Sequence, residues 1–125
     1  MKKLHIVTAV IELGAGLAFL CFPSTTAELL VGSPLHTPIG LTVARICGAG
    51  LFSLGVACWL ARGDTESRAA KGLIAAMLLY NASVAGILTF AGLGFGLFGV
   101  ALWPAVVLHS VMAIWCIEYL RREFV

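Results

Sequence analysis

The chain has 125 residues, of which 61% are hydrophobic and only 11% are charged, and its formal net charge is +2. Its mean hydropathy is +1.04, which excludes a soluble domain of this length, because such a domain needs a much larger polar surface. The composition predicts an integral membrane protein that lies among membrane lipid and has no nucleic acid among its partners.

The first apolar segment covers residues 4–22 and follows Lys2 and Lys3. A helix needs about 20 residues to cross the ~30 Å hydrocarbon core of a bilayer, so this segment is long enough for one span. It is longer than the apolar core of a usual signal peptide and carries a carboxylate, Glu12, in its middle. We therefore expect a retained transmembrane helix rather than a cleaved leader.

The stretch PSTTAELLVGSPLHTP, residues 23–38, follows the first span and carries signals of a short helix. Thr25 and Glu28 have the spacing of a capping box, Gly32 can end a helix, and the later prolines prevent its continuation. These signals predict a short periplasmic helix at the membrane interface. It is either a connector that buries its leucines or a lid over the larger helices.

The last apolar block runs from residue 72 to residue 120 and is more than twice as long as one span requires. Its glycines between residues 92 and 99 predict a tight turn that divides the block into two helices. Pro104 then falls in the first turn of the last helix, where the missing N–H costs no hydrogen bond.

The fold class is therefore an all-α membrane protein, an antiparallel bundle of four transmembrane helices in a single transmembrane domain over residues 1–125. The predicted spans are residues 4–22, 39–61, 72–92 and 100–120.

The glycine-rich turn reads GFGLFG over residues 94–99 and fits the pattern G-x-G-x-x-G. In dinucleotide-binding proteins this motif joins a strand to a helix whose N-terminus holds the pyrophosphate. Neither partner is expected between two membrane spans, so the motif predicts a turn and not a nucleotide site.

The basic residues indicate the orientation of the chain, because cytoplasmic loops carry the excess of Lys and Arg. Seven of the eight fall on one side of the four-span scheme: Lys2, Lys3, Arg62, Arg68, Lys71, Arg121 and Arg122. We expect a multi-pass protein of a bacterial inner membrane with both termini in the cytoplasm.

Each predicted span contains one strongly polar residue near the middle of the membrane: Glu12, Arg45, Asn81 and His109. A charged side chain at the centre of a span costs about 2.5 to 3.5 kcal/mol on insertion scales, so Glu12 should seek a partner. We predict that Glu12 is ionised and forms a buried ion pair with Arg45, while Asn81 and His109 complete the hydrogen bonds. The cluster is either a structural lock between helices or a ligand-binding site.

Helical spacing predicts which faces turn inward. On the first helix the inward stripe is His5, Thr8, Glu12 and Gly16, and on the second it is Arg45, Gly48, Phe52, Gly55 and Trp59. Ala49, Ser53 and Ala57 form a ridge of small residues for close packing of the second helix.

The four cysteines are scattered singly, without the C-x-x-C spacing of redox or zinc sites. His109, Met112 and Cys116 share a helical face and are a weak candidate for a soft metal such as copper. Met and Cys on an apolar helix are usually packing residues. We expect no metal and no cofactor.

The segment RICGAGLFSLGVACWLAR, residues 45–62, together with the four spans, resembles the small bacterial inner-membrane proteins of the DoxX-like type. The resemblance implies a four-helix bundle and a role near membrane redox components. It also directs attention to Arg45.

A second resemblance is to the small multidrug resistance transporters, which have similar length, four spans and an essential Glu in the first. Glu12 is the position that transfers. This resemblance implies a proton-coupled transporter of small molecules, whereas a fixed pair with Arg45 and a single orientation speak against it.

The sequence supports two functions of a central polar cluster: binding of a small apolar molecule with a polar head, such as a quinone or lipid, or a role as an accessory subunit of a membrane complex. Enzyme chemistry is not expected, because no nucleophile and base have credible spacing. Aromatic residues near the outer turn favour a homo-oligomer or a complex: Phe90, Phe95, Phe98 and Trp103.

Overall fold

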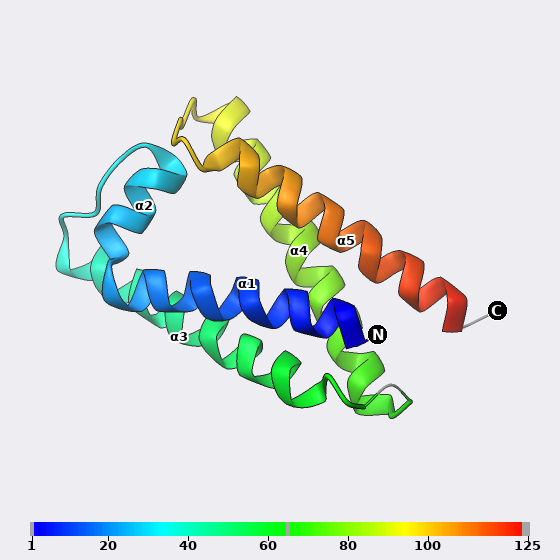
Figure 1. Cartoon of the computed structure of the whole chain (residues 1–125). Helices are drawn as coiled ribbons and strands as arrows, with labels where there is room; N and C mark the ends of the chain where they lie inside the picture. The colour runs from blue at the N-terminus through cyan, green and yellow to red at the C-terminus, as the bar shows by residue number, and fades with distance from the viewer. Residues whose placement is uncertain (1, 65, 124–125) are drawn as a thin grey trace.

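The computed structural model describes residues 2–64 and 66–123, and all regular structure in these ranges is helical (Figure 1). The helices are α1 (Lys2–Cys21), α2 (Pro23–Val31), α3 (Pro38–Ala61), α4 (Arg68–Gly94) and α5 (Leu102–Glu123). All except α2 are long and apolar enough to cross a membrane. The prediction of an all-α chain with four long apolar helices is confirmed.

Local signals explain where several helices begin. The side chain of Thr37 accepts a hydrogen bond from the Gly40 N–H at 3.0 Å, and Pro38 occupies the first position of α3. Ser67 caps α4 in the same way, accepting from the Ala70 N–H at 3.1 Å. Pro104 lies in the first turn of α5, as predicted.

The predicted capping box of the short helix is wrong. Helix α2 begins at Pro23, so Thr25 lies inside the helix and does not cap it. The chain turns directly from α1 into α2, because Pro23 fixes the backbone of the first turn and the Thr26 hydroxyl donates to the Phe22 carbonyl at 2.7 Å. The predicted end at Gly32 is confirmed, since this glycine has φ +80° and closes the helix.

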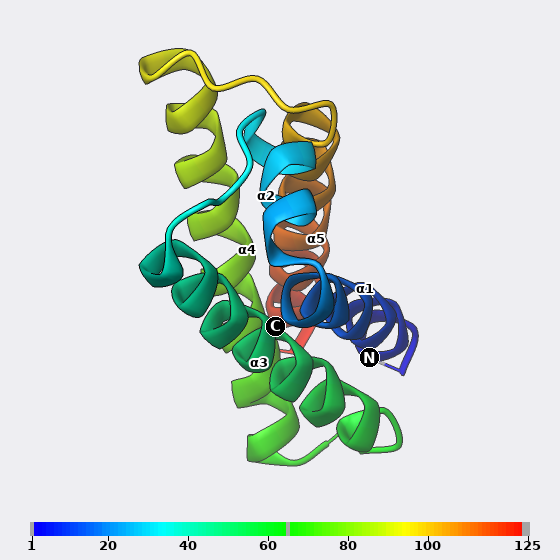
Figure 2. The same cartoon turned by 90° about the vertical axis from the view of Figure 1, so that its left-hand side faces the viewer.

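The long helices pack in two close pairs, α1 with α3 and α4 with α5 (Figures 1 and 2). Glycines allow the first pair to touch: a Cβ on Gly16 would lie 2.5 Å from the Phe52 nitrogen, and one on Gly48 would lie 2.9 Å from the Gly16 carbonyl. Further along, Gly55 meets the backbone of Leu13. Close backbone approach of this kind is how small residues stabilise helix pairs in lipid.

The predicted small-residue ridge of the second long helix does not form this contact. Ala49, Ser53 and Ala57 are exposed on α3, and Gly48 and Gly55 take their place at the interface with α1. The ridge and the glycines lie on different faces of one helix, and α1 packs against the face where Cβ atoms are absent.

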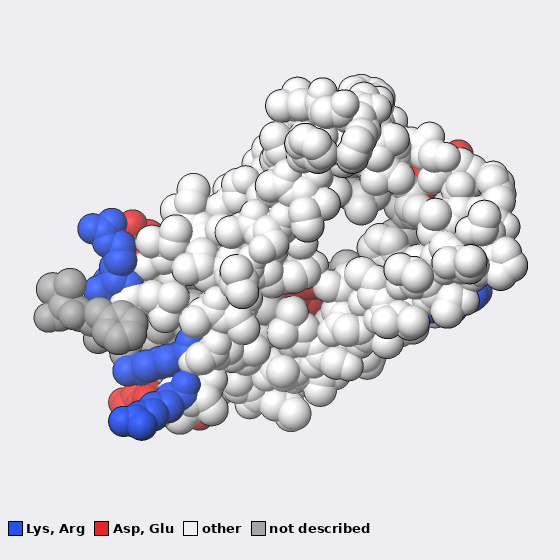
Figure 3. All heavy atoms as spheres, turned by 180° about the vertical axis from the view of Figure 1, so that it is seen from behind, with Lys and Arg blue, Asp and Glu red and all other residues white. Residues whose placement is uncertain are grey.

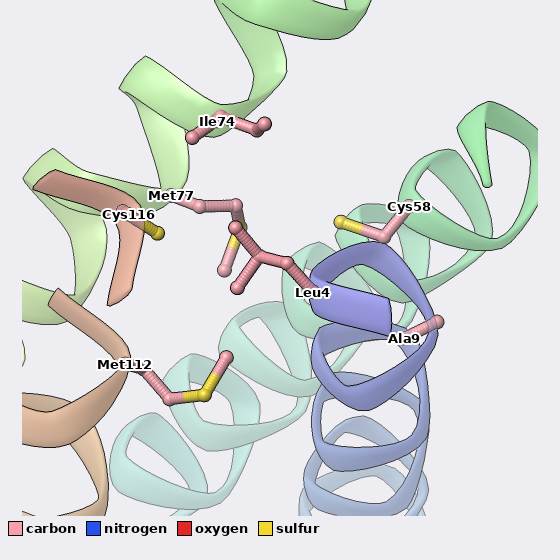
Figure 4. Close-up of a cluster of buried hydrophobic side chains, with 7 residues drawn as sticks. All are labelled: Leu4, Ala9, Cys58, Ile74, Met77, Met112 and Cys116. Atoms are coloured by element: carbon pink, nitrogen blue, oxygen red, sulfur yellow. The ribbon is translucent and has the colours of Figure 1, made fainter. Parts of the chain in front are cut away.

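At the end of the molecule that carries both chain ends, a cluster of buried apolar side chains joins the two pairs (Figure 4). Its members come from all four long helices: Leu4, Ala9, Cys58, Ile74, Met77, Met112 and Cys116. Lipid tails are as apolar as these side chains, so the cluster stabilises the fold through close packing and dispersion rather than through the hydrophobic effect.

At the opposite end the turn between α4 and α5 docks on α2 (Figure 2). The Ala101 N–H donates to the Leu29 carbonyl at 2.8 Å, and Gly99 lies against the Leu29 and Leu30 backbone with no room for a Cβ. The turn begins later than predicted, because α4 continues through Gly94. Gly96, with φ +67°, supplies the left-handed backbone of the turn.

Candidate functional site

Between the two helix pairs lies a cavity of about 380 Å³ to which all five helices contribute side chains. Its wall is mostly apolar, and Glu12, Tyr80 and His109 add the larger polar groups. Figure 3 shows a hollow from behind, in surface without Lys or Arg and with acidic atoms visible nearby, while most Lys and Arg side chains gather at one end of the molecule. The size falls within the range of small-molecule sites, about 300 to 1,000 Å³.

Glu12 reaches the cavity from the buried face of α1. The stripe predicted for this helix is confirmed, because His5, Thr8, Glu12 and Gly16 are all buried. Only 2% of Glu12 is exposed, and the hydroxyl of Tyr80 on α4 hydrogen-bonds to its carboxyl group. The carboxyl is therefore held by a neutral donor from the opposite helix pair.

Asn81 and His109, two of the predicted residues, contact each other directly. The Asn81 Oδ1 lies 2.7 Å from the His109 Nδ1, and the Asn81 Nδ2 donates to the Met77 carbonyl at 2.8 Å. The ring of Tyr80 stands edge-on to the His109 ring, with centroids 5.6 Å apart. Three of the four predicted polar residues thus lie at one place, with Tyr80 between them.

The predicted ion pair between Glu12 and Arg45 is wrong. Arg45 is exposed, and its Nε donates to the Leu20 carbonyl at 3.4 Å, while no ion pair involves Glu12 among residues 2–64 and 66–123. Gly48 of α3 packs on Gly16 and Leu20, which puts Arg45 about one turn beyond, near the C-terminus of α1. A cation is well placed there, because the last carbonyls of a helix lack partners and carry partial negative charge.

The inward stripe predicted for the second long helix is also only partly right. Gly48 and Gly55 are buried, whereas Arg45 and Trp59 are exposed. The buried face is instead completed by Ala44, Leu51 and Cys58, so the true stripe is rotated relative to the predicted one.

His5 has an unusual environment for a polar side chain. It is only 1% exposed, and neither ring nitrogen has a hydrogen-bond partner in the part of the chain that the structure describes. Buried polar atoms are normally paired, so His5 lowers the stability of the folded chain unless something else satisfies it.

The three residues of the metal candidate lie in two different environments: His109 in one, and Met112 and Cys116 in the other. The His109 Nδ1 is bonded to Asn81, whereas Met112 and Cys116 pack in the apolar cluster of Figure 4. Within the described ranges, no group of three or more His, Cys, Asp and Glu side chains is arranged to hold a metal ion.

Tyr80 is the residue of this site that the sequence analysis did not predict. Tyr is most common at membrane–water interfaces, where its hydroxyl reaches water, but Tyr80 lies in the middle of α4 next to Asn81. The hydroxyl of a Tyr far from an interface needs a buried hydrogen-bond acceptor. The position of Tyr80 near the middle of a span is therefore the sequence signal that indicates a polar partner for it.

Comparison of the chain with family models, curated proteins and solved structures finds no match. The resemblances to DoxX-like proteins and to small multidrug resistance transporters stay predictions.

Proposed function

We propose that this chain binds one small apolar molecule with a polar head, a quinone or a related lipid, in the cavity between its helix pairs. The observation that carries this proposal is a mostly apolar cavity of about 380 Å³ with Glu12, Tyr80 and His109 on its wall. Sites for small molecules typically combine apolar walls with a few polar groups that fix the orientation of the ligand. The function is binding, without catalysis and without a resident metal or cofactor.

The proposal includes a membrane topology. The four long helices cross a bacterial inner membrane as an antiparallel bundle, with α2 at the periplasmic surface and both termini in the cytoplasm. The concentration of Lys and Arg at one end of the molecule supports this orientation (Figure 3). A ligand from the membrane would then meet the cavity within the hydrocarbon layer.

Purification in a mild detergent, followed by organic extraction and mass spectrometry, tests the proposal. We expect a quinone or lipid in a fixed ratio to the protein. Ala105→Phe, which fills the cavity, should lose it, whereas Ala75→Phe on the exposed face of α4 should keep it. Equal amounts in all three proteins would show that the extracted molecules are only surrounding lipid.

A second candidate function is proton-coupled transport of a small molecule through Glu12. The specific observation in its favour is that Glu12 borders the cavity and has no ionic partner among the described residues. Carboxylates inside membranes often mark proton pathways. Proton uptake driven by a substrate in proteoliposomes, lost in Glu12→Gln, would favour transport, and its absence across many cations would exclude it.

The role of an accessory subunit is tested by the same purification. Phe90, Phe95 and Phe98 are largely exposed near the turn between α4 and α5, where a second copy or another membrane protein could pack. Protein partners in a fixed ratio, without a retained small molecule, would support this role over ligand binding.

A further inference from the structure

The directions of the hydrogen bonds around the cavity restrict which ligands it can bind. The Met77 carbonyl can only accept, so the Asn81 atom 2.8 Å from it is the amide nitrogen. The remaining Asn81 atom, the carbonyl oxygen, must therefore accept from the His109 Nδ1 at 2.7 Å. A neutral His109 that carries its proton on Nδ1 has a bare Nε2, which is an acceptor.

The other two polar groups also offer acceptors. The Tyr80 hydroxyl donates a hydrogen bond to the Glu12 carboxyl, and the lone pairs of the phenol oxygen stay free to accept one. The carboxyl group retains further lone pairs beyond the one that Tyr80 uses. Among the residues that the structure describes, no Lys or Arg lines the cavity, so a ligand finds acceptors there but no cationic donor.

One loosely packed seam of the molecule lies between α3 and α4. The pairs α1 with α3 and α4 with α5 are tight and α1 touches α5, but α3 and α4 barely meet. Cys47 on α3 lines the cavity and is nevertheless exposed. Its small side chain therefore stands at one of the places where the cavity opens to the surroundings.

The volume of the cavity limits how much of a ligand it can hold. An engineered apolar cavity of ~150 Å³ binds benzene, so about 380 Å³ accommodates a substituted ring and a short part of a tail. A long tail must leave through an opening, and the surface around the hollow in Figure 3 shows no Lys or Arg and is mostly uncharged, as is surface that faces lipid.

From these observations we infer that the site selects a single-tailed amphiphile whose neutral, ring-sized head donates a hydrogen bond from a hydroxyl, such as a phenol or quinol. The head lies against Glu12, Tyr80 and His109, and the tail passes Cys47 between α3 and α4 into the bilayer. This inference rests on the proposed binding function. A phosphate head is disfavoured, because its charge would meet acceptors and the Glu12 carboxyl.

A matched pair of probes tests the head. In nanodiscs, a long-chain para-alkylphenol should bind at least about tenfold more tightly than the same molecule with fluorine in place of the hydroxyl, because the lost donor leaves buried acceptors unpaired. In Asn81→Leu, His109 can carry its proton on Nε2, which then no longer accepts a hydrogen bond from the ligand. The difference in affinity between the phenol and the fluorinated probe should therefore become smaller, while both still bind. Binding of both probes with equal affinity to the unchanged protein would overturn the inference and leave the binding function intact.

A matched pair of variants tests the tail. Cys47→Trp should weaken binding of the long-chain phenol about tenfold or more and leave binding of para-ethylphenol nearly unchanged. Cys21→Trp, at the other exposed thiol, lies away from the cavity and should affect neither. If Cys47→Trp weakens both phenols equally, or neither, the path of the tail is wrong. If no probe binds to any protein, the proposed function itself fails.

Discussion

The Nδ1 of His109 on α5 donates a hydrogen bond to the Oδ1 of Asn81 on α4 at 2.7 Å, in the middle of both helices. This bond joins the two helices of the pair, and Asn81 is held in turn by the Met77 carbonyl one turn earlier on α4.

Replacing Asn81 with Leu should lower the stability of the protein by about 0.5 to 2 kcal/mol, since His109 loses its partner in a site that water does not reach freely. Thermal unfolding in detergent measures the change. Ser83→Leu, at an exposed position of the same helix, is the control and should leave the midpoint of unfolding nearly unchanged. A midpoint of Asn81→Leu as high as that of the original protein would mean that the bond contributes no stability.

The effects of Glu12→Gln and Arg45→Gln should add. The two residues share no contact, and additivity within about 0.5 kcal/mol is usual for independent sites. The combination of Glu12→Leu with Tyr80→Phe should instead be less harmful than the sum of the two single changes, because each change removes the same hydrogen bond. A double-mutant cycle measured by thermal unfolding distinguishes these outcomes. Strong coupling between the effects of Glu12→Gln and Arg45→Gln would contradict this prediction and support an ion pair between the two residues.

Gly99→Ala should destabilise the protein by about 1 to 3 kcal/mol or more. A Cβ at this position would overlap the Leu29 carbonyl, which is backbone and cannot turn away. Gly86→Ala is the matched control, because nothing lies within 4 Å of its Cβ and Ala is favoured over Gly inside a helix by up to about 1 kcal/mol. Thermal unfolding should therefore separate the two alanine variants in opposite directions.

The stability of the folded chain should depend on pH through Asp64, in the loop before α4. The Ser67 side chain and the backbone N–H groups of Ser67 and Glu66 hydrogen-bond to this carboxylate and hold its pKa below the usual range. A lowered pKa means that the stabilising effect is present above the ordinary value, near pH 4, and is lost as the pH falls through the lower value of the folded state.

Asp64→Ala should therefore reduce thermal stability slightly at pH 7, and the difference from the original protein should vanish in acid. Glu66→Ala removes a neighbouring carboxylate and keeps the backbone N–H that binds Asp64, so it is the control. A difference for Asp64→Ala that stays constant from pH 7 into strong acid would contradict the assignment.

Much of the fold could be predicted because its signals are local. The long apolar segments predicted four of the helices, Pro104 marked the first turn of α5, and Gly32 marked the end of α2. In each case one residue or run constrains its own backbone. The capping box failed because Pro23, two residues before Thr25, already starts the same helix and determines where its first turn lies.

The candidate site was predicted in part, because counting residues gives the depth of a side chain but not its direction. Asn81 and His109 lie at matching depths and do meet. The sequence predicts a similar depth for Arg45, but α3 is rotated so that Ala44 is buried and Arg45 is exposed. That rotation depends on glycines of two helices fitting together, a relationship that no single helix reveals.

The division into two helix pairs has a consequence for how the protein is made. Helices α1 and α3 are joined through α2, and α4 and α5 follow each other, so each tight pairing lies within one half of the chain. The first half can assemble in the membrane while the second is still being synthesised, and Glu12 then has no Tyr80 to bind. Two fragments translated separately, divided in the loop between α3 and α4, should therefore each insert and then find one another in the bilayer.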